Sequence, residues 1–341
     1  MVRDNTTRRQ MLQITGGAAA VGLSGLAGCT GSFNGGTTTF KYGHPNSPDS
    51  VVGQFASKLS DEVESRTEGE VKINVHPSSQ LGGVSDMIQG TSSGSIEMGH
   101  NDFSALGQLY EQMSVFNLPY IYEDRDHLMR ATDPRSSEVL QELNKELVDK
   151  SDIRVIGGWY YGRRQLTCNS AIKKPADLNN KKIRAIPLKV FLTTVRGLGA
   201  QPEAVDFSEL PSALATGVVD GQENPLVTID ANKFYEQQSH LMMTSHITLQ
   251  LPVYINEKAW QGLSEENQQT VRSTIAELRA ESLAEGKQKE QELRGTLQEK
   301  GMTIIDESSG LQLDAFKESV NDEVESAFSG WSDLVSRIEK I

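Results

Sequence analysis

Hydrophobic and polar positions follow two rhythms along this chain, one typical of helices and the other typical of strands. Between residues 50 and 66, apolar side chains recur every three or four positions with charges between them, which predicts an amphipathic helix. Residues 84–93 have a helical pattern, and residues 71–75 alternate with a period of two, like a half-buried strand. Further short apolar runs predict strands at 40–43, 153–157, 182–186 and 218–220. Strands that alternate with helices indicate an α/β fold.

The stretch from residue 264 to residue 300 differs from the rest because it contains few helix breakers. Ser264 can cap its start, and Glu265 and Glu266 would lie in the positive first turn. About 35 helical residues span on the order of 50 Å, which is longer than one small domain. A coiled coil would also suit the charged composition, but the apolar positions do not keep a strict heptad. We therefore expect one long helix that crosses the back of two domains.

Residues 1–28 have the pattern of an export signal. Arg8 and Arg9 form a twin-arginine motif, and the Gly- and Ala-rich stretch of about 15 residues that follows is too short to span a membrane. It ends at Cys29 in a sequence like a lipobox, so Cys29 is expected to carry a lipid. An ordinary secretory signal with a chance cysteine is the alternative. Residues 29–39 have the composition of a flexible tether, and the folded part is expected to begin near Phe40.

Length and charge narrow the function classes. The 341 residues suffice for two domains or one large one. The net charge is −13, and it becomes −15 when residues 1–28, with three arginines and one aspartate, are removed. Such acidity keeps a protein soluble and argues against nucleic acid as the main partner, because phosphate binding needs a positive surface. The pattern predicts an exported protein, held by a lipid at the outer face of the cytoplasmic membrane.

The chain lacks the sequence motifs of common catalytic sites. It has no HExxH, no GxGxxG and no phosphate loop, and its six histidines show no metal-ligand spacing. Two cysteines exclude a disulfide framework and a cysteine-based zinc site. Cys168 has no identifiable partner for nucleophilic chemistry and is interpreted as a small buried hydrophobe. The residues themselves therefore support no enzyme, and we expect neither a metal nor a cofactor.

Arginines and amides gather in the middle of the chain. They occur in three segments, residues 159–169, 175–187 and 219–226. Arg184 ends a predicted strand, and ligands bind at strand ends in open α/β sheets. A guanidinium can hold a carboxylate by two parallel hydrogen bonds, although a surface ion pair is the alternative for Arg184 and for Arg164. Asn224 precedes a proline, so it is held extended and is expected to project from a loop, with an Asx turn as the alternative.

Together these segments resemble the substrate-binding proteins of tripartite ATP-independent periplasmic (TRAP) transporters. The resemblance continues at Lys41–His44, Val71–Gly82, Leu118–Tyr120, Gly199–Ala200, Phe207–Glu209, Asp220–Pro225 and Lys233–Glu236. It implies a two-lobed periplasmic-binding-protein-like fold, with connecting strands, a cleft between the lobes and a long helix spanning both. It also implies capture of a small organic acid without catalysis and delivery to membrane permease subunits. An ion gradient rather than ATP would drive that transport.

The resemblance assigns a role to several residues. Arg184 matches the arginine that ion-pairs the substrate carboxylate, and Arg164 matches a second arginine that adds to it. Asn224 matches an amide that hydrogen-bonds the same carboxylate, and Phe207 matches an aromatic side chain in the pocket wall.

Other residues are expected around the rest of the ligand. Asn101 or Asp102 falls where family members place a polar side chain that selects this part, and His44 lies in a first-strand loop that lines the cleft. Trp159 and Tyr160 are expected as walls, with a place in the core as the alternative.

The expected lobes are discontinuous in sequence. Lobe I takes residues 40–161 and 250–289, and lobe II takes residues 162–249 and 290–341. One departure from the family concerns Gly83–Ser85, where some members carry acidic residues. Because the polar contacts that those acidic residues make to a sugar acid would be missing here, the expected ligand is a simple mono- or dicarboxylate. Two other functions stay open at this point, a secreted enzyme acting on organic acids and a receptor module that presents a ligand to a membrane sensor.

Overall fold

The computed structural model describes residues 37–341, so the predicted export residues Arg8, Arg9 and Cys29 lie outside the described part of the chain. The strands are β1 (Thr38–Gly43), β2 (Val71–His76), β3 (Met98–His100), β4 (Ile153–Cys168), β5 (Lys182–Ala185), β6 (Gln201–Ala204), β7 (Gly221–Pro225), β8 (His240–Asn256) and β9 (Thr303–Ile305). The α-helices are α1 (Val51–Arg66), α2 (Val84–Ser93), α3 (Phe103–Leu106), α4 (Arg125–Ala131), α5 (Glu138–Ser151), α6 (Lys189–Gly197), α7 (Leu210–Ala215), α8 (Leu226–Ala231), α9 (Glu257–Gln261), α10 (Glu265–Glu299), α11 (Leu313–Ala327) and α12 (Ser332–Ile338). The 3-10 helices are η1 (Glu111–Asn117), η2 (Pro175–Leu178), η3 (Phe207–Glu209), η4 (Phe234–Glu236), η5 (Glu307–Ser309) and η6 (Ser329–Trp331).

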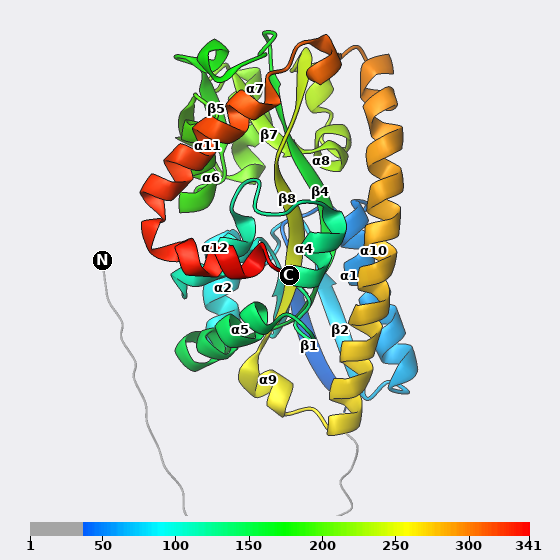
Figure 1. Cartoon of the computed structure of the whole chain (residues 1–341). Coiled ribbons are helices and arrows are strands. Elements are labelled where there is room, and N and C mark those ends of the chain that lie inside the picture. The colour runs from blue at the N-terminus through cyan, green and yellow to red at the C-terminus, as the bar shows by residue number, and fades with distance from the viewer. Residues whose placement is uncertain (1–36) are drawn as a thin grey trace, which may run out of the picture. The chain divides into compact units, whose positions relative to one another are not determined.

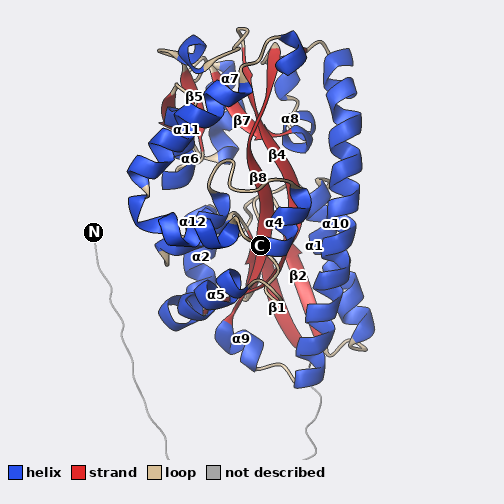
Figure 2. Cartoon of the chain, viewed as in Figure 1, coloured by secondary structure: helices blue, strands red, loops and turns tan. Residues whose placement is uncertain are grey.

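The described strands form one sheet built around two long strands. Its order is β2-β1-β3-β8-β4-β7-β5-β6, with β9 beside β8. Strand β4 has 16 residues and β8 has 17, and they pair antiparallel over most of their length. Strand β3 pairs with the last residues of β8, whereas β7 pairs with the last residues of β4, at the opposite end of the long pair. Each end therefore carries its own smaller group of strands (Figures 1 and 2).

The fold is two-lobed, as the sequence predicts. We call the part around β1, β2 and β3 lobe I and the part around β5, β6 and β7 lobe II. Helix α1 packs on β2 in lobe I, while α6 packs on β6 and α11 in lobe II. The two long strands run from one lobe into the other, so the lobes share a continuous sheet (Figure 1).

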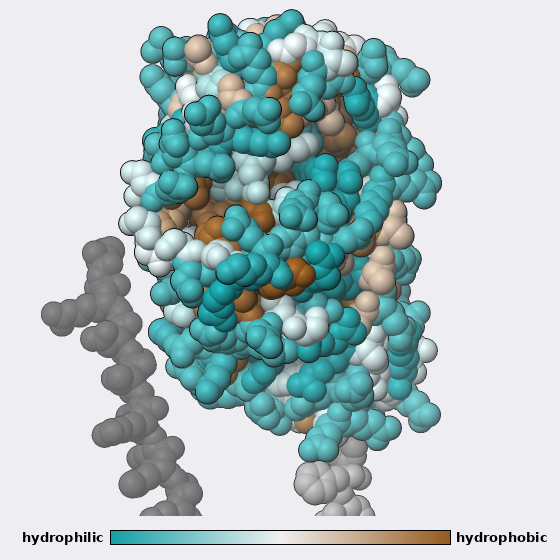
Figure 3. All heavy atoms as spheres, in the orientation of Figure 1, coloured by the Kyte–Doolittle hydropathy of each residue, from teal (hydrophilic) through white to brown (hydrophobic). Residues whose placement is uncertain are grey.

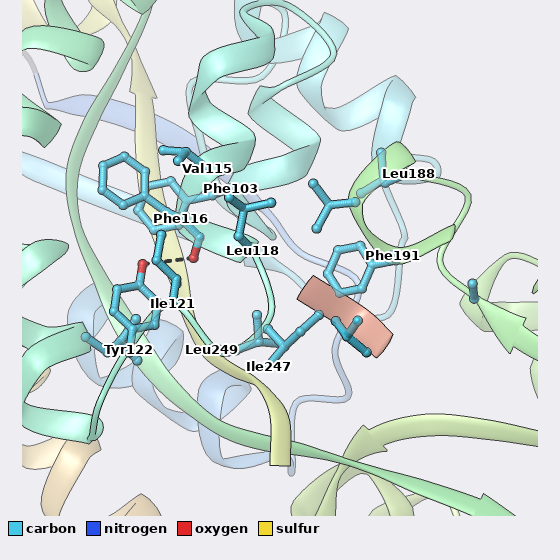
Figure 4. Close-up of a cluster of buried hydrophobic side chains, with 14 of the residues drawn as sticks. Phe103, Val115, Phe116, Leu118, Ile121, Tyr122, Leu188, Phe191, Ile247 and Leu249 are labelled. Carbon is cyan, nitrogen blue, oxygen red and sulfur yellow. Dashed lines mark hydrogen bonds between the residues drawn. The ribbon is translucent and has the colours of Figure 1, made fainter. Parts of the chain in front are cut away.

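One hydrophobic cluster continues between the lobes. It includes Phe103 and Phe116 from one side and Leu188 and Phe191 from the other, with Ile247 and Leu249 of β8 between them (Figure 4). Cys168, interpreted as a small hydrophobe, is buried in the same cluster. The face drawn in Figure 3 is mostly hydrophilic, as the acidic composition requires, and its hydrophobic atoms gather near the middle.

Helix α10 confirms the prediction of a long helix that spans both lobes. Ser264 caps it, because its hydroxyl accepts a hydrogen bond from the backbone N–H of Asn267 at 3.1 Å. The helix packs on α1 of lobe I, on α8 of lobe II and on β4 between them (Figure 1). It therefore joins the lobes from outside, parallel to the connection that β4 and β8 make inside.

Three expectations about segment boundaries are wrong. Strand β1 begins at Thr38, so the end of the expected tether is part of the sheet, through pairing with β2. Residues 218–220 form no strand; the strand is β7, and it includes Asn224, which the sequence placed in a loop. Helix α12 packs on α5 of lobe I rather than in lobe II. Arg337 of α12 is held there by Glu142 at 2.7 Å.

No helix within residues 37–341 is both long enough and apolar enough to cross a membrane.

Two glycines of α10 give a matched test of how closely this helix packs on β4. A Cβ atom at Gly286 would lie 2.4 Å from the ring of Tyr160, whereas a Cβ at Gly295 would have nothing within 4 Å. Alanine raises helix propensity equally at both positions, by about 1 kcal/mol. We expect Gly286→Ala to lower the free energy of unfolding by about 1–3 kcal/mol through overpacking, and Gly295→Ala to raise it by about 0.5–1 kcal/mol. Urea unfolding followed by circular dichroism measures both, and equal stabilisation of the two variants would contradict the close contact.

Candidate functional site

A cavity of about 200 Å³ lies at the junction of the lobes. Lobe I contributes the loop between β3 and α3, and lobe II contributes β5 and the 3-10 helix η3. The cavity brings together six of the residues singled out from the sequence, which are Asn101, Asp102, Arg164, Arg184, Phe207 and Asn224. They come from distant parts of the chain, and the sheet order β4-β7-β5 places three of them on adjacent strands.

Arg184 lies near the end of β5, as the strand-end argument predicts, and only 1% of it is exposed. Its Nε donates a hydrogen bond to the backbone oxygen of Val205 at 2.8 Å, and its guanidinium lies 5.9 Å from the ring centre of Phe207. Its Nη1 is buried and has no hydrogen-bond partner among the described residues. Burial lowers the pKa of Arg184 to about 10, so the side chain is still a cation at neutral pH.

Arg164 on β4 is also 1% exposed, but it already has a counterion. Glu223 on β7 accepts hydrogen bonds from it with both carboxylate oxygens. Nη2 and Oε1 are 2.7 Å apart, and Nε pairs with Oε2. The same Nη2 donates to Oδ1 of Asn224 at 3.1 Å, and the guanidinium lies 5.1 Å from the ring centre of Phe191. Burial opposes the charge of Arg164, but Glu223 outweighs burial and raises the pKa of Arg164.

Glu223 and His246 are parts of the site that the sequence did not single out. Burial disfavours the Glu223 carboxylate, but Arg164 and a hydrogen bond from His246 lower its pKa to about 2. Burial lowers the pKa of His246, so its ring is neutral, with Nε2 donating to Glu223 at 3.0 Å. The other ring nitrogen then accepts from the hydroxyl of Thr244 at 2.9 Å. The sequence shows Glu223 only as a neighbour of Asn224, and only strand pairing brings it to Arg164.

Asn101 and Asp102 supply polar atoms from the other side of the cavity. The Nδ2 of Asn101 and the Oδ1 of Asp102 are buried and have no partner among the described residues. Burial raises the pKa of Asp102 to about 6, against the opposing effect of Arg164 and Arg184. The cavity therefore offers one unpartnered cationic donor, one amide donor and one carboxyl acceptor.

Three expected residues do not line this cavity. His44 is fully buried and stacks on His100 with ring centres 4.5 Å apart, so its neighbours Pro45 and Asn46 face the cavity instead. Trp159 packs on Phe55 in the core of lobe I, with ring centres 5.8 Å apart.

Tyr160 packs against α10, where its hydroxyl accepts from Nε of Arg125 at 2.9 Å and donates to Oε2 of Glu290 at 3.2 Å. Trp159 and Tyr160 therefore have the core role that the sequence left open as the alternative.

The segment after Gly82 is more polar than the sequence comparison suggested. Ser85, Asp86 and Gln108 all line the cavity, and the hydroxyl of Ser85 donates to Oε1 of Gln108 at 2.7 Å. The premise that polar contacts are missing here, which favoured a simple mono- or dicarboxylate, is therefore wrong.

Within residues 37–341, no three His, Cys, Asp or Glu side chains cluster as metal ligands would.

Residues 42–330 match the sequence family described as bacterial extracellular solute-binding protein, family 7. The chain is 33% identical over 267 residues to the sialic acid-binding periplasmic protein SiaP of Vibrio cholerae, covering 78% of this chain and 82% of that protein. It is 31% identical over 241 residues to the C4-dicarboxylate-binding periplasmic protein DctP of Rhodobacter capsulatus, covering 70% of each.

A solved structure gives the same fold. A TRAP periplasmic solute-binding protein from Roseobacter denitrificans with bound L-galactonate superposes with a TM-score of 0.80 at 29% identity. The match covers 88% of this chain and 98% of that one.

The ion pair between Arg164 and Glu223 gives a prediction about stability. Glu223→Gln leaves a buried guanidinium without its counterion, and loss of one partner of a buried pair costs about 3–5 kcal/mol. We expect a loss of that size in the free energy of unfolding, measured with urea at pH 7. Glu142→Gln is the control, because its pair with Arg337 is largely exposed and exposed pairs contribute less than about 1 kcal/mol. Similar losses in the two variants would contradict the special position of Glu223.

Proposed function

This chain belongs to the bacterial extracellular solute-binding proteins of family 7, and on that premise we propose that Arg184 captures the carboxylate of a hydroxylated organic acid in the cavity between the lobes. The protein is the solute-binding component of a TRAP transporter; it takes up a small organic acid outside the cytoplasm and delivers it to the membrane permease.

The observation that supports the role of Arg184 is its unpartnered Nη1. A buried cation whose donor has no partner is costly, so the site gains most from a ligand that supplies a negative oxygen at that point. Arg164 has the same burial, but Glu223 already neutralises it. The two arginines thus differ in role: Arg184 supplies the charge that binds the acid, and Arg164 is a fixed polar wall beside it.

Asn224 and Phe207 complete the proposed carboxylate subsite. The Oδ1 of Asn224 accepts a hydrogen bond from Arg164, and its Nδ2 donates one N–H to Oε1 of Gln222, so its second N–H is available for a ligand oxygen. Phe207 lies beside the Arg184 guanidinium, which its ring face attracts, and it lines the same cavity. Both contacts hold the donors in place before a ligand arrives.

Asn101 and Asp102 define the rest of the ligand. The unpartnered carboxyl oxygen of Asp102 needs a donor, and the unpartnered amide of Asn101 needs an acceptor. A hydroxyl group can satisfy both, because it donates one hydrogen bond and accepts others. A ligand that combines a carboxylate with hydroxyl groups fits this arrangement better than a plain dicarboxylate does.

Uptake would proceed by closure of the lobes. The lobe assignment, residues 40–161 with 250–289 and residues 162–249 with 290–341, is part of the proposal, with α12 moved to lobe I. Four connections would bend as the cavity closes and water leaves, namely β4, β8, α10 and the η6 segment that joins α11 to α12. We propose that the ligand is released unchanged. We also propose that Arg8 and Arg9 direct export and that Cys29 carries a lipid anchor, as the N-terminal sequence indicates.

Replacement of Arg184 tests the carboxylate subsite. A thermal-shift screen with L-galactonate, other sugar acids, sialic acid, succinate and malate first identifies a ligand, and calorimetry then gives its dissociation constant. We expect Arg184→Gln to weaken binding at least ~30-fold, since loss of a buried charge partner costs about 2–5 kcal/mol. Arg163→Gln is the matched control, because this neighbouring arginine does not line the cavity. Unchanged affinity in Arg184→Gln would contradict the proposed role of Arg184 in carboxylate binding.

The pKa of Asp102 gives a prediction about pH. A ligand hydroxyl that donates to Asp102 prefers the ionised carboxylate, so affinity should fall about tenfold as the pH drops from 7.5 to 5, through the pKa of about 6. The neighbouring Glu223 and Arg184 do not titrate in this range, because their pKa values are about 2 and about 10. Asp102→Asn should remove the dependence. Tighter binding at pH 5 would show instead that Asp102 repels the ligand, as expected for a ligand with carboxylates alone.

A further inference from the structure

A second cavity, of about 300 Å³, lies between β4, α10 and the loop that joins α4 to α5. It shares no lining residue with the first cavity, which lies between the lobes and contains Arg184. Four arginines line it: Arg135 from the loop, Arg154 from β4, and Arg272 and Arg279 from α10. The function described above makes no use of them.

Arg279 is the most deeply fixed of the four. Its side chain is 8% exposed, and its Nε donates to Oε1 of Gln250 at 3.0 Å. Its Nη2 donates to the hydroxyl of Thr132 at 3.2 Å, and its Nη1 lies 3.6 Å from Oδ2 of Asp133. Asp133 also binds Nη2 of Arg135 at 2.7 Å. The carboxylate of Asp133 thus pairs with the guanidinium groups of both Arg135 and Arg279.

The other two arginines have one carboxylate between them. Glu257 binds Arg154 with both oxygens, at 2.6 Å to Nε and 2.7 Å to Nη2. The guanidinium of Arg272 lies over the ring of Trp260, 4.8 Å from its centre, rather than against a carboxylate. The ring face attracts the cation, but it adds no negative charge.

The charges around this cavity do not balance. Among the described residues, the four guanidinium groups have two carboxylates between them, Asp133 in the cavity wall and Glu257 beside it, so the cluster has two excess positive charges in a chain whose net charge is −13. Burial lowers the pKa of Arg279 to about 10, and the charge of Arg135 acts in the same direction. Burial and then Arg154 lower the pKa of Arg272. Arg135 therefore repels Arg279, and Arg154 repels Arg272. An anion bound between these side chains would relieve the repulsion.

We propose that this cavity binds a small oxyanion with two negative charges, such as sulfate or hydrogen phosphate. The guanidinium N–H groups supply donors in the geometry that oxyanions accept. Two negative charges match the excess of the cluster. The bound anion would link the loop, β4 and α10, and would stabilise lobe I where it meets the long helix.

Thermal unfolding in sulfate tests the proposal. The melting temperature of the purified protein is measured from 0 to 10 mM sodium sulfate, with sodium chloride keeping the ionic strength constant. For a dissociation constant near 1 mM, we expect a rise of about 2–4 °C at 10 mM. Arg272→Gln should reduce the rise to less than about 1 °C.

Two further variants locate the effect. Arg66→Gln removes another guanidinium beside α10, where Arg66 pairs with Glu277, and it should keep the full rise. Arg184→Gln should also keep it. If Arg184→Gln loses the rise in melting temperature, sulfate occupies the cavity between the lobes, and the proposal is overturned. An undiminished rise in Arg272→Gln would also overturn it. So would the absence of any rise in the unaltered protein. None of these outcomes depends on the affinity for the organic acid.

Discussion

The ion pair between Arg164 and Glu223 joins β4 to β7 inside the sheet, where each side chain is only 1% exposed. Two charges in such a place are tolerable only together, because either one alone would lack both water and a counterion. The pair therefore does two things at once. It fixes the strand that carries Asn224 against β4, and it cancels the charge of one of the two arginines in the cavity. Arg184 keeps its own charge and a buried nitrogen that has no partner among the described residues. His246 supports the arrangement by donating to Glu223 while it stays neutral.

Strand β4, which carries Arg164 of the pair, is also one of the long elements that connect the lobes. Strands β4 and β8 pass from one lobe to the other through the sheet, and α10 does so along the outside. In the proposed closure, the lobes would approach each other by bending a few continuous segments rather than by breaking an interface. The cavity lies at the junction, so its walls come from both lobes, and the proposed closure would change the distance between Asp102 in lobe I and Arg184 in lobe II. The proposed charge recognition and lobe movement would thus be coupled.

The sequence was informative where local rules decide the structure. Helix α10 begins at the predicted cap, and α2 has the predicted bounds, because caps and apolar spacing act within one segment. Arg184 could be placed near a strand end for the same reason. The sequence failed where distant segments meet. Strand β8 was missed although its second half carries a signal, because residues 247–255 alternate with an apolar side chain at every second position. Glu223 had no visible role until strand pairing set it beside Arg164. Trp159 looks the same in sequence whether it lines a pocket or packs on Phe55.

The central claim is that Arg184, and not Arg164, supplies the charge that holds the ligand. A crystal structure with the organic acid bound tests it most directly. We expect a carboxylate oxygen of the ligand within about 3 Å of Nη1 of Arg184, with both oxygens of Glu223 still on Arg164. A ligand carboxylate that instead displaces Glu223 and pairs with Arg164, leaving Nη1 of Arg184 without a partner, would contradict it.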